Sequence, residues 1–188
     1  MAVEPMSKRS PPSDFLSDQL ARIQAASQLG VVIDLACGRG RHALAAAAAD
    51  ISIIGIDRNR TFLAELREAA AQPALAVETL LADLEDPAEI PLRSHCCGAV
   101  LVFRYLHRPL IPAITRVLAP GGLLVYETFT TDQRHLETGP RNPDHLLEPG
   151  ELPELFSSLE ILDHWEGRSN EVENAHVARI TARANPRG

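Results

Sequence analysis

Short apolar runs alternate with helix-forming stretches over residues 14–129 of the chain. The apolar runs have the length and continuity of strands that are buried on both faces of a sheet. They predict strands at 31–36, 51–57, 74–83, 97–106 and 123–129. Apolar residues at helical spacing and an alanine-rich segment predict helices at 14–26, 41–50, 60–72 and 109–119. Strands that alternate with helices indicate βαβ units, and therefore a doubly wound, mostly parallel α/β sheet.

The pattern changes after Phe129. Residues 130–150 are polar and contain three prolines and two glycines, and this segment is too long for an ordinary connection. We expect a lid or a binding loop there. A short helix is predicted at 151–158, followed by strands at 159–166 and 174–182. Only about seven residues separate these strands, too few for a parallel crossover, so we predict an antiparallel pair at one edge of the sheet.

The amino end of the chain differs from the rest. Residues 1–12 are polar and rich in proline, which predicts a flexible tail. Ser13 or Asp14 is expected to cap the first helix, and Gly30 to end it. The chain has 188 residues, of which 45% are hydrophobic, and this is enough for one domain with a sizeable core. Residues 13–188 are therefore predicted to form a single domain.

Composition narrows the possible functions. The formal net charge of −7 argues against a surface that tracks nucleic-acid phosphates. No stretch approaches the roughly 20 apolar residues that span a membrane, and the amino end lacks the apolar region of a secretory signal. The three cysteines, Cys37, Cys96 and Cys97, are not spaced for a disulfide framework or a zinc site. We therefore expect a cytoplasmic protein without a metal.

The stretch VVIDLACGRGRH at 31–42 supports two interpretations. From Gly38, the sequence Gly-Arg-Gly-Arg-His-Ala fits the G-x-G-x-x-G/A pattern of dinucleotide-binding folds, in which a pyrophosphate lies at a helix N-terminus. From Asp34, the sequence fits D-x-x-x-G-x-G, an acid followed by a glycine loop, as found in S-adenosylmethionine sites. S-adenosylmethionine carries a sulfonium and an ammonium in place of phosphates, so its site needs carboxylates.

Three acids follow strand ends in positions suited to a nucleoside ligand. Asp34 lies near the end of a buried strand, where a carboxylate costs several kcal/mol unless it is paired or caps loop amides. The ammonium group of S-adenosylmethionine would form an ion pair with the carboxylate of Asp34, whereas a dinucleotide has no such group. Asp57 ends the second strand and can accept both ribose hydroxyls of either cofactor. Asp83 follows the third strand and can accept from an adenine amino group. A helix N-cap acid at 57 and an exposed loop acid at 83 are the alternatives.

Four segments together resemble the class I S-adenosylmethionine-dependent methyltransferases: Asp34 to Gly40, Asp57, Ala82-Asp83-Leu84 and LAPGGLLVYETF at 118–129. The resemblance covers residues 30–129. It implies a seven-stranded Rossmann-like sheet whose last strand is antiparallel. The sequence departs from the family pattern at Ala36, where the family usually has its first glycine. We expect the extra methyl group to be tolerated if φ stays negative there. HLLEPGELPELF at 145–156 also resembles the small tellurite-resistance-type branch of this family.

The resemblance also implies the cofactor site. It assigns Asp34 and the 36–40 loop to the methionine end, Asp57 to the ribose and Asp83-Leu84 to the adenine. Phe103 and Arg104 would line the transfer site at the end of the fourth strand. The predicted cofactor-binding residues are Asp34, Ala36, Gly38, Gly40, Asp57, Arg58, Asp83, Leu84 and Phe103.

The segment FRYLHRP at 103–109 contains the candidate residues for the methyl acceptor. It lacks the Asn/Asp-Pro-Pro-aromatic motif of enzymes that methylate amino nitrogens of bases, which argues against nucleic-acid substrates. Arg104, Tyr105 and His107 are predicted to be catalytic and, with Arg108, to bind a small, anionic acceptor. His107 is the candidate base, because an unperturbed imidazole titrates near neutral pH. Solvated arginines and a histidine that begins the next helix are the alternatives.

Other polar residues are weaker candidates. Glu127 and Thr128 close the fifth strand, and the long loop contributes His135, Arg141, Asn142 and His145. The favoured function is methyl transfer from S-adenosylmethionine to a small molecule. Two alternatives remain: an NAD-binding oxidoreductase, and a non-catalytic methyltransferase-like binding subunit.

Overall fold

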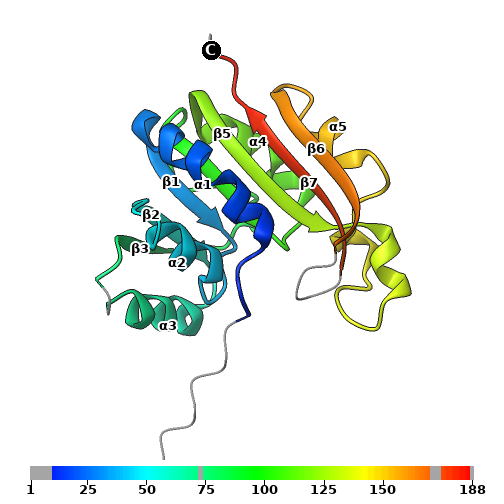
Figure 1. Cartoon of the computed structure of the whole chain (residues 1–188), viewed down its shortest axis with the longest axis horizontal. Coiled ribbons are helices and arrows are strands. Elements are labelled where there is room, and N and C mark those ends of the chain that lie inside the picture. The colour runs from blue at the N-terminus through cyan, green and yellow to red at the C-terminus, as the bar shows by residue number, and fades with distance from the viewer. Residues whose placement is uncertain (1–9, 72–73, 170–174, 187–188) are drawn as a thin grey trace, which may run out of the picture.

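A computed structural model describes residues 10–71, 74–169 and 175–186, which form one sheet of seven strands with helices on both faces (Figure 1). The strand order is β3-β2-β1-β4-β5-β7-β6. Adjacent strands from β3 to β5 are parallel, and β7 is antiparallel to both of its neighbours. The strands are β1 (Val31–Leu35), β2 (Ile53–Asp57), β3 (Val77–Leu81), β4 (Cys97–Phe103), β5 (Leu118–Phe129), β6 (Glu160–Ser169) and β7 (Ala175–Arg183). The predicted fold class is confirmed, including the antiparallel pair at one edge.

In the part of the chain that the structure describes, five α-helices cover the sheet. On one face lie α1 (Asp14–Ala26), α2 (Arg41–Ala47) and α3 (Arg60–Ala71), and on the other lie α4 (Ile111–Val117) and α5 (Glu151–Leu155) (Figure 1). Four short 3₁₀ turns complete the described helical segments: η1 (Ser27–Leu29), η2 (Arg108–Leu110), η3 (Thr131–His135) and η4 (Pro143–His145). Ser13 caps α1 by accepting a hydrogen bond from the backbone of Phe15, as predicted.

The core consists of two apolar layers, one on each side of the sheet. Every residue of β4 is buried, which explains its continuous apolar sequence. Along β4, Ala99, Leu101 and Phe103 pack among α1, α2 and α3, whereas Val100 and Val102 pack on the side of α4 and α5. This alternation fixes the register of the central strand, because a slip of one residue would exchange its two faces.

Several predicted element boundaries were wrong, and backbone geometry gives the reasons. The strand predicted at 97–106 ends at Phe103 because Arg104 adopts a left-handed φ of 59°. The helix predicted to extend to 119 ends at Val117, because Pro120 disfavours helical geometry in the residue before it, Ala119. The helix predicted at 41–50 ends at Ala47, before Asp50 with its φ of 60°.

Other boundaries shifted by a few residues. β2 and β3 are shorter than predicted, β5 begins at Leu118, α5 ends at Leu155, and β6 extends to Ser169. Position 72 of the third predicted helix and position 174 of the last predicted strand lie outside the described residues. So do residues 1–9 of the predicted tail, and the single-domain assignment stays a prediction.

The segment at 130–150 is anchored to the fold at both of its ends. Thr130 forms a parallel bridge with Leu147, and Leu146 and Leu147 are buried. The amide side chain of buried Gln133 donates to the carbonyl of Thr138 and accepts from the backbone of His176. These contacts restrict any closing motion to the exposed residues between the anchors.

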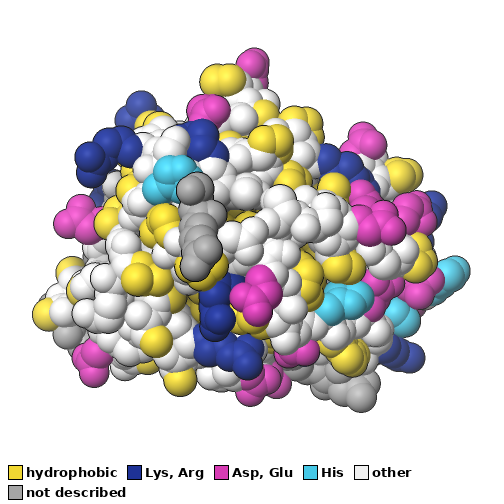
Figure 2. All heavy atoms as spheres, turned by 90° about the horizontal axis from the view of Figure 1, so that it is seen from above, with side chains coloured by type: hydrophobic (Ala, Val, Ile, Leu, Met, Phe, Trp, Pro, Cys, Tyr) yellow, Lys and Arg dark blue, Asp and Glu magenta, His cyan; other side chains and the backbone are white. Residues whose placement is uncertain are grey.

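Figure 2 views the face at the amino ends of the parallel strands, where acidic and basic side chains are interspersed with scattered apolar ones. In the part of the chain that the structure covers, no helix is both long and apolar enough to cross a membrane.

Candidate cofactor and methyl-acceptor site

The strand order reverses between β1 and β4, and the predicted cofactor residues follow the carboxyl ends of these strands and of β2 and β3. Ligands of doubly wound folds bind at such a switch point. Asp34 on β1 is only 1% exposed, and its Oδ2 has no hydrogen-bond partner among the described residues. Burial raises the pKa of Asp34 to about 7, although the backbone of Ala43 and the charge of Arg41 oppose this shift. A buried carboxylate without a full set of partners fits a site that a cation completes.

The loop after β1 is held by the acid that ends β2. Oδ2 of Asp57 accepts from the backbone N–H of Gly38 at 2.8 Å, and Oδ1 accepts from that of Asn59 at 2.8 Å. Gly40 has a φ of 76°, and a Cβ there would lie 2.2 Å from Leu66, so glycine is required for both reasons. Asp57 thus joins β2 to the glycine loop before any ligand binds.

Ala36 differs from our expectation. Its φ is 51°, so the condition that φ stays negative is not met. An alanine in the left-handed region costs about 1–2 kcal/mol. The family's usual glycine would avoid this strain, whereas Ala36 retains it at the start of the loop.

A cavity of about 180 Å³ opens beside this loop. It is lined by Ala36, Asp57, Arg58, Ala82, Asp83, Leu84, Glu85 and Tyr105. Five of the nine predicted cofactor residues therefore line one cavity, and Tyr105 and Glu85 join them. Arg58 forms ion pairs with Glu85 at 3.1 Å and Asp83 at 3.8 Å. The cavity thus combines apolar walls with carboxylate acceptors, as a nucleoside requires.

Phe103 lies on the other side of the β4 end, within an aromatic cluster. The ring of His42 stacks on Phe103 with centroids 3.9 Å apart, and Phe15 meets Phe103 edge-on at 6.4 Å. Nε2 of His42 accepts from the backbone N–H of Ser13 at 3.2 Å. Burial and the charges of Arg41 and Arg104 lower the pKa of His42 well below 6.5, so this ring is neutral.

Arg104 belongs to a buried charge cluster around Glu127. Glu127 is fully buried; its Oε1 lies 3.4 Å from Nε of Arg104, and its Oε2 lies 2.6 Å from Nε of Arg179. The hydroxyl of Ser13 also donates to Oε2 at 3.0 Å. The guanidinium of Arg104 lies 4.7 Å from the ring centre of Phe129. These contacts attach the N-terminus of α1 to the carboxyl ends of β4 and β5, where methyl transfer is expected.

The other acceptor candidates do not share this location. Tyr105 lines the cavity that contains Asp57 and Asp83, and its predicted role at the methyl acceptor stays a prediction. Arg108 holds Glu151 in a bidentate ion pair at 2.6 and 2.8 Å, and it donates to the carbonyls of Asp144 and Leu146. Its guanidinium thus holds the loop, and its role in binding the acceptor stays a prediction. Nε2 of His107 is buried and has no hydrogen-bond partner among the described residues.

The loop residues that sequence reasoning singled out interact mainly with the loop itself. Arg141 donates to the carbonyls of residues 134, 136 and 137, and Asn142 caps η4. His135 is 80% exposed, and its Nδ1 lies 4.0 Å from Asp132.

Sequence reasoning missed Ser13, His42 and Arg179, which contact Phe103 or Glu127 near the carboxyl ends of β4 and β5. Arg179 had a detectable signal, because it is a charged residue within the apolar run of the last strand. His42 lay inside the glycine-loop stretch and received no role. Ser13 was predicted only as a helix cap, and its contact with Glu127 spans 114 positions of the chain.

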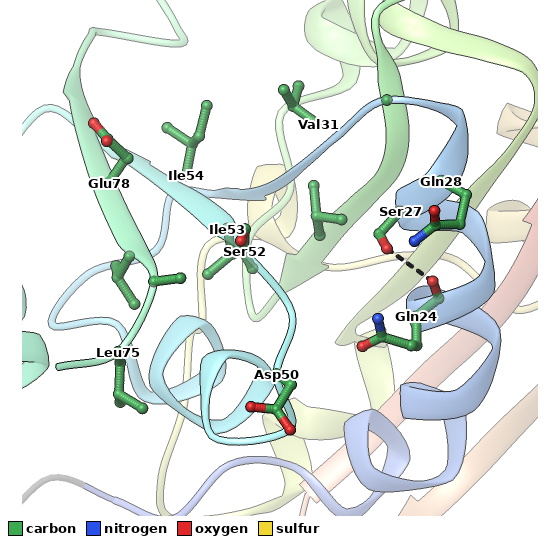
Figure 3. A pocket seen from close by; sticks show the side chains of 14 residues that line it. Gln24, Ser27, Gln28, Val31, Asp50, Ser52, Ile53, Ile54, Leu75 and Glu78 are labelled. Atoms are coloured by element: carbon green, nitrogen blue, oxygen red, sulfur yellow. Dashed lines mark hydrogen bonds between the residues drawn. The ribbon is translucent and has the colours of Figure 1, made fainter. Parts of the chain in front are cut away.

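A second cavity, of about 910 Å³, lies at the opposite end of the strands. Figure 3 shows Gln24 of α1 and Ser27 and Gln28 of η1 facing Ser52 and Ile53 at the start of β2. Its lining contains none of the predicted site residues.

A Rossmann-like sheet with a reversed strand at one edge, a buried acid before a glycine loop and a second acid on the next strand define a nucleoside-binding α/β protein. Comparison with known proteins makes this class specific. Residues 32–122 match the family model described as a methyltransferase domain. Over these residues the chain carries a methyltransferase domain, and it is similar to the class I S-adenosylmethionine-dependent methyltransferases.

One curated relative is the trans-aconitate 2-methyltransferase of Methylobacterium nodulans, 33% identical over 135 residues. The match covers 71% of this chain and 45% of that protein, so the chain spans about half the length of this relative.

Solved structures share the fold. TehB from Haemophilus influenzae superposes with a TM-score of 0.66 at 21% identity, over 88% of this chain and 62% of that one. An S-adenosylmethionine-dependent methyltransferase from Methanosarcina mazei gives 0.71 at 18% identity, over 87% and 97%.

The match to a methyltransferase domain implies S-adenosylmethionine as the cofactor, and the chain's residues fit it. Asp34 provides a buried carboxylate oxygen without a partner among the described residues, which suits an ammonium group. The cavity that contains Asp57 and Asp83 provides acceptors for ribose hydroxyls and an adenine amino group.

Proposed function

We propose that the protein transfers a methyl group from S-adenosylmethionine to a small, anionic acceptor bound beside Arg104. The observation that carries this proposal is the buried carboxylate of Asp34 at the switch point, one of whose oxygens has no partner among the described residues. A dinucleotide would bring phosphates toward this acid, whereas the ammonium of S-adenosylmethionine would neutralise it. The NAD-dependent oxidoreductase and the non-catalytic subunit are not favoured, since the family match is to methyltransferases.

The cofactor is held by residues from three strand ends. Asp34 binds the ammonium, with the loop from Ala36 through Gly38 to Gly40 approaching the methionine end. Asp57 accepts from the ribose, with Arg58 beside it. Asp83 accepts from the adenine amino group while Leu84 packs against the ring. Phe103 is proposed to face the reacting end, where its stacking with His42 supports a rigid, dry wall.

The acceptor binds where Arg104 and Phe129 meet. The side chain of Arg104 is only 12% exposed, and a guanidinium in such a site orients a carboxylate or another oxyanion strongly. The sulfonium of the cofactor activates the methyl group, so the task of the protein is to align an acceptor oxygen and to exclude water. An acceptor that is already ionised needs no base. Where the acceptor is a hydroxyl, His107 is the proposed base, supported by its unbonded Nε2.

Two further observations bear on acceptor and location. The curated relative is named for trans-aconitate, an anion, which supports an anionic small molecule here as well. Cys37, Cys96 and Cys97 are all free thiols, which supports the proposed cytoplasmic location.

Calorimetry tests the cofactor. S-adenosylhomocysteine is expected to bind at micromolar strength and to raise the melting temperature, while NAD does neither. A ligand that binds only the folded state at a hundredfold excess over Kd stabilises it by about 2.7 kcal/mol. Binding of NAD without binding of S-adenosylhomocysteine would overturn the assignment.

A methyl-transfer screen tests the acceptor. Carboxylates, other oxyanions, phenols and thiols are offered with labelled S-adenosylmethionine to the wild type, to Arg104→Ala and to His107→Ala. Arg67→Ala is the matched control, because this arginine lies on α3 and its side chain donates to the hydroxyl of Thr79. We expect turnover of an anionic compound that Arg104→Ala loses and Arg67→Ala keeps. Turnover of a neutral or cationic compound in Arg104→Ala at the wild-type rate would refute the acceptor proposal.

A further inference from the structure

Tyr105 has a hydroxyl that the fold leaves without a partner. Its Oη is buried and makes no hydrogen bond among the described residues. The residue lines the cavity of Asp57, Asp83 and Leu84. A buried hydroxyl without a hydrogen-bond partner costs free energy. A ligand in the cavity beside it could supply that partner.

The backbone of Tyr105 is held firmly from behind. The hydroxyl of Tyr126, a fully buried residue of β5, donates to the carbonyl oxygen of Tyr105 at 2.9 Å. Arg104, with its φ of 59°, ends β4 just before Tyr105. Tyr105 consequently packs against the core layer of α4 and α5, whereas Phe103 belongs to the opposite layer. The ring is therefore positioned at the cavity wall by fixed neighbours.

The surroundings of the phenol decide its chemical role. Burial and the nearby carboxylates of Glu85 and Asp83 raise the pKa of Tyr105, so the hydroxyl keeps its proton and can donate. Glu85, Asp83 and Asp57 can only accept when they are ionised. An adenine ring offers both an amino donor and ring-nitrogen acceptors. Carboxylates satisfy the amino group, and a hydroxyl donor is what the ring nitrogens require.

We propose that the hydroxyl of Tyr105 donates a hydrogen bond to a ring nitrogen of the cofactor's adenine and thereby determines specificity for the base. This inference rests on the proposed cofactor. It replaces the expectation that Tyr105 acts on the methyl acceptor, and makes Tyr105 a cofactor-binding residue that never touches the transferred methyl group.

The Tyr105→Phe variant isolates the hydroxyl, because the ring and its packing stay. Calorimetry with S-adenosylhomocysteine is expected to give a Kd that is about three- to tenfold weaker than that of the wild type. Without ligand, Tyr105→Phe should melt at the wild-type temperature or above it, since the removed group had no partner. A purely structural hydroxyl would instead lower that temperature.

Analogues of S-adenosylhomocysteine identify the accepting atom. Versions with carbon in place of N1, N3 or N7 are titrated into the wild type and Tyr105→Phe. One of them should bind both proteins with the same Kd, because its partner atom is already missing. Thr115→Val is the control: it removes a hydroxyl that bonds within α4 to Ile111, and its Kd for S-adenosylhomocysteine should match the wild type.

The outcomes separate the inference from the function on which it rests. Absence of S-adenosylhomocysteine binding by the wild type would overturn the proposed function and this inference together. Tight binding by the wild type with an equal Kd for Tyr105→Phe would overturn this inference alone. Equal losses for all three analogues in both proteins would also overturn it, since no ring nitrogen would then depend on Tyr105.

Discussion

The carboxylate of Asp57 accepts a hydrogen bond from the backbone N–H of Gly38 at 2.8 Å, so the acid that ends β2 holds the glycine loop that follows β1. Asp57 ends β2 and Gly38 lies in the loop after β1; these two strands are parallel neighbours, so their carboxyl ends meet at one edge of the sheet. One side chain therefore both shapes the loop and faces the cavity beside it. Changes at this position should affect stability and cofactor binding by different amounts.

Asp57→Ala is expected to abolish measurable binding of S-adenosylhomocysteine while the protein stays folded. Two charge-assisted hydrogen bonds to the ribose would be lost, each worth about 1.5–3 kcal/mol. The free energy of unfolding should also fall by about 1–3 kcal/mol, because the N–H groups of Gly38 and Asn59 lose their acceptor. Calorimetry measures the first effect and urea unfolding the second.

Asp57→Asn is the matched control for this prediction. The amide oxygen still accepts from Gly38 but carries no charge, so we expect most of the stability to return and most of the affinity to stay lost. A Kd in Asp57→Ala equal to that of the wild type would show that the ribose binds elsewhere.

The second prediction concerns the pH dependence of cofactor affinity. With a pKa of about 7, Asp34 is mostly protonated at pH 6 and mostly ionised at pH 8. Only the ionised form pairs with the ligand's ammonium, so affinity for S-adenosylhomocysteine should rise about tenfold between these values and binding should release a proton. Calorimetry in buffers of different ionisation enthalpy measures both. Asp34→Asn should bind weakly with little pH dependence in this range, and a wild-type affinity that falls with rising pH would contradict the assignment.

The same group gives a stability prediction of opposite sign for the unliganded protein. The pKa of Asp34 is raised from 3.8 in the unfolded chain to about 7 in the folded one. Between these values the folded state holds a proton that the unfolded state has released, so stability should fall as pH rises through this window. The loss approaches about 4 kcal/mol and is complete above pH 7. Urea unfolding at several pH values, with Asp34→Asn as the reference, isolates this contribution.

Ala36→Gly is expected to stabilise the protein. Glycine removes the left-handed strain at φ 51°, worth about 1–2 kcal/mol, but loses about 0.5–1 kcal/mol through its freedom in the unfolded chain. The net gain of up to about 1.5 kcal/mol corresponds to a rise in Tm of up to about 3–6 °C for a chain of this length. Gly38→Ala is the mirror test: its φ is 55° and nothing lies within 4 Å of the added Cβ, so it should lower Tm by strain alone. The prediction fails if both changes shift Tm in the same direction.

Much of the fold could be predicted because the relevant signals are local. Continuous apolar runs identified β1 and β4, and the short gap before β7 required an antiparallel pair. The acids at 34, 57 and 83 each follow an apolar run, and parallel strands bring such positions to the same edge. Asp57 and Asp83 accordingly meet at one cavity.

The acceptor end could not be predicted because its geometry depends on a single backbone angle and on distant contacts. In a strand that continued to residue 106, Phe103 and Tyr105 would share a face. The left-handed φ of Arg104 ends the strand and places them in opposite core layers. The contact of Ser13 with Glu127 joins residues 114 positions apart, and no local pattern encodes such a pair. The ion pair of Arg108 with Glu151 could not be predicted either, because 43 positions separate the two residues.

Arg108→Ala should loosen the loop without affecting the cofactor. The guanidinium binds Glu151 and two loop carbonyls, and the ion pair raises the pKa of Arg108 while lowering that of Glu151. The side chain of Arg108 is 35% exposed, so solvent screening limits the loss to about 1–2 kcal/mol. Hydrogen exchange should quicken at residues 143–151, while the Kd for S-adenosylhomocysteine stays unchanged. Glu151→Gln should reproduce the faster exchange in weaker form. Unchanged exchange in both variants would mean that Leu146 and Leu147 hold the loop by burial alone, and that Arg108 is available for another role.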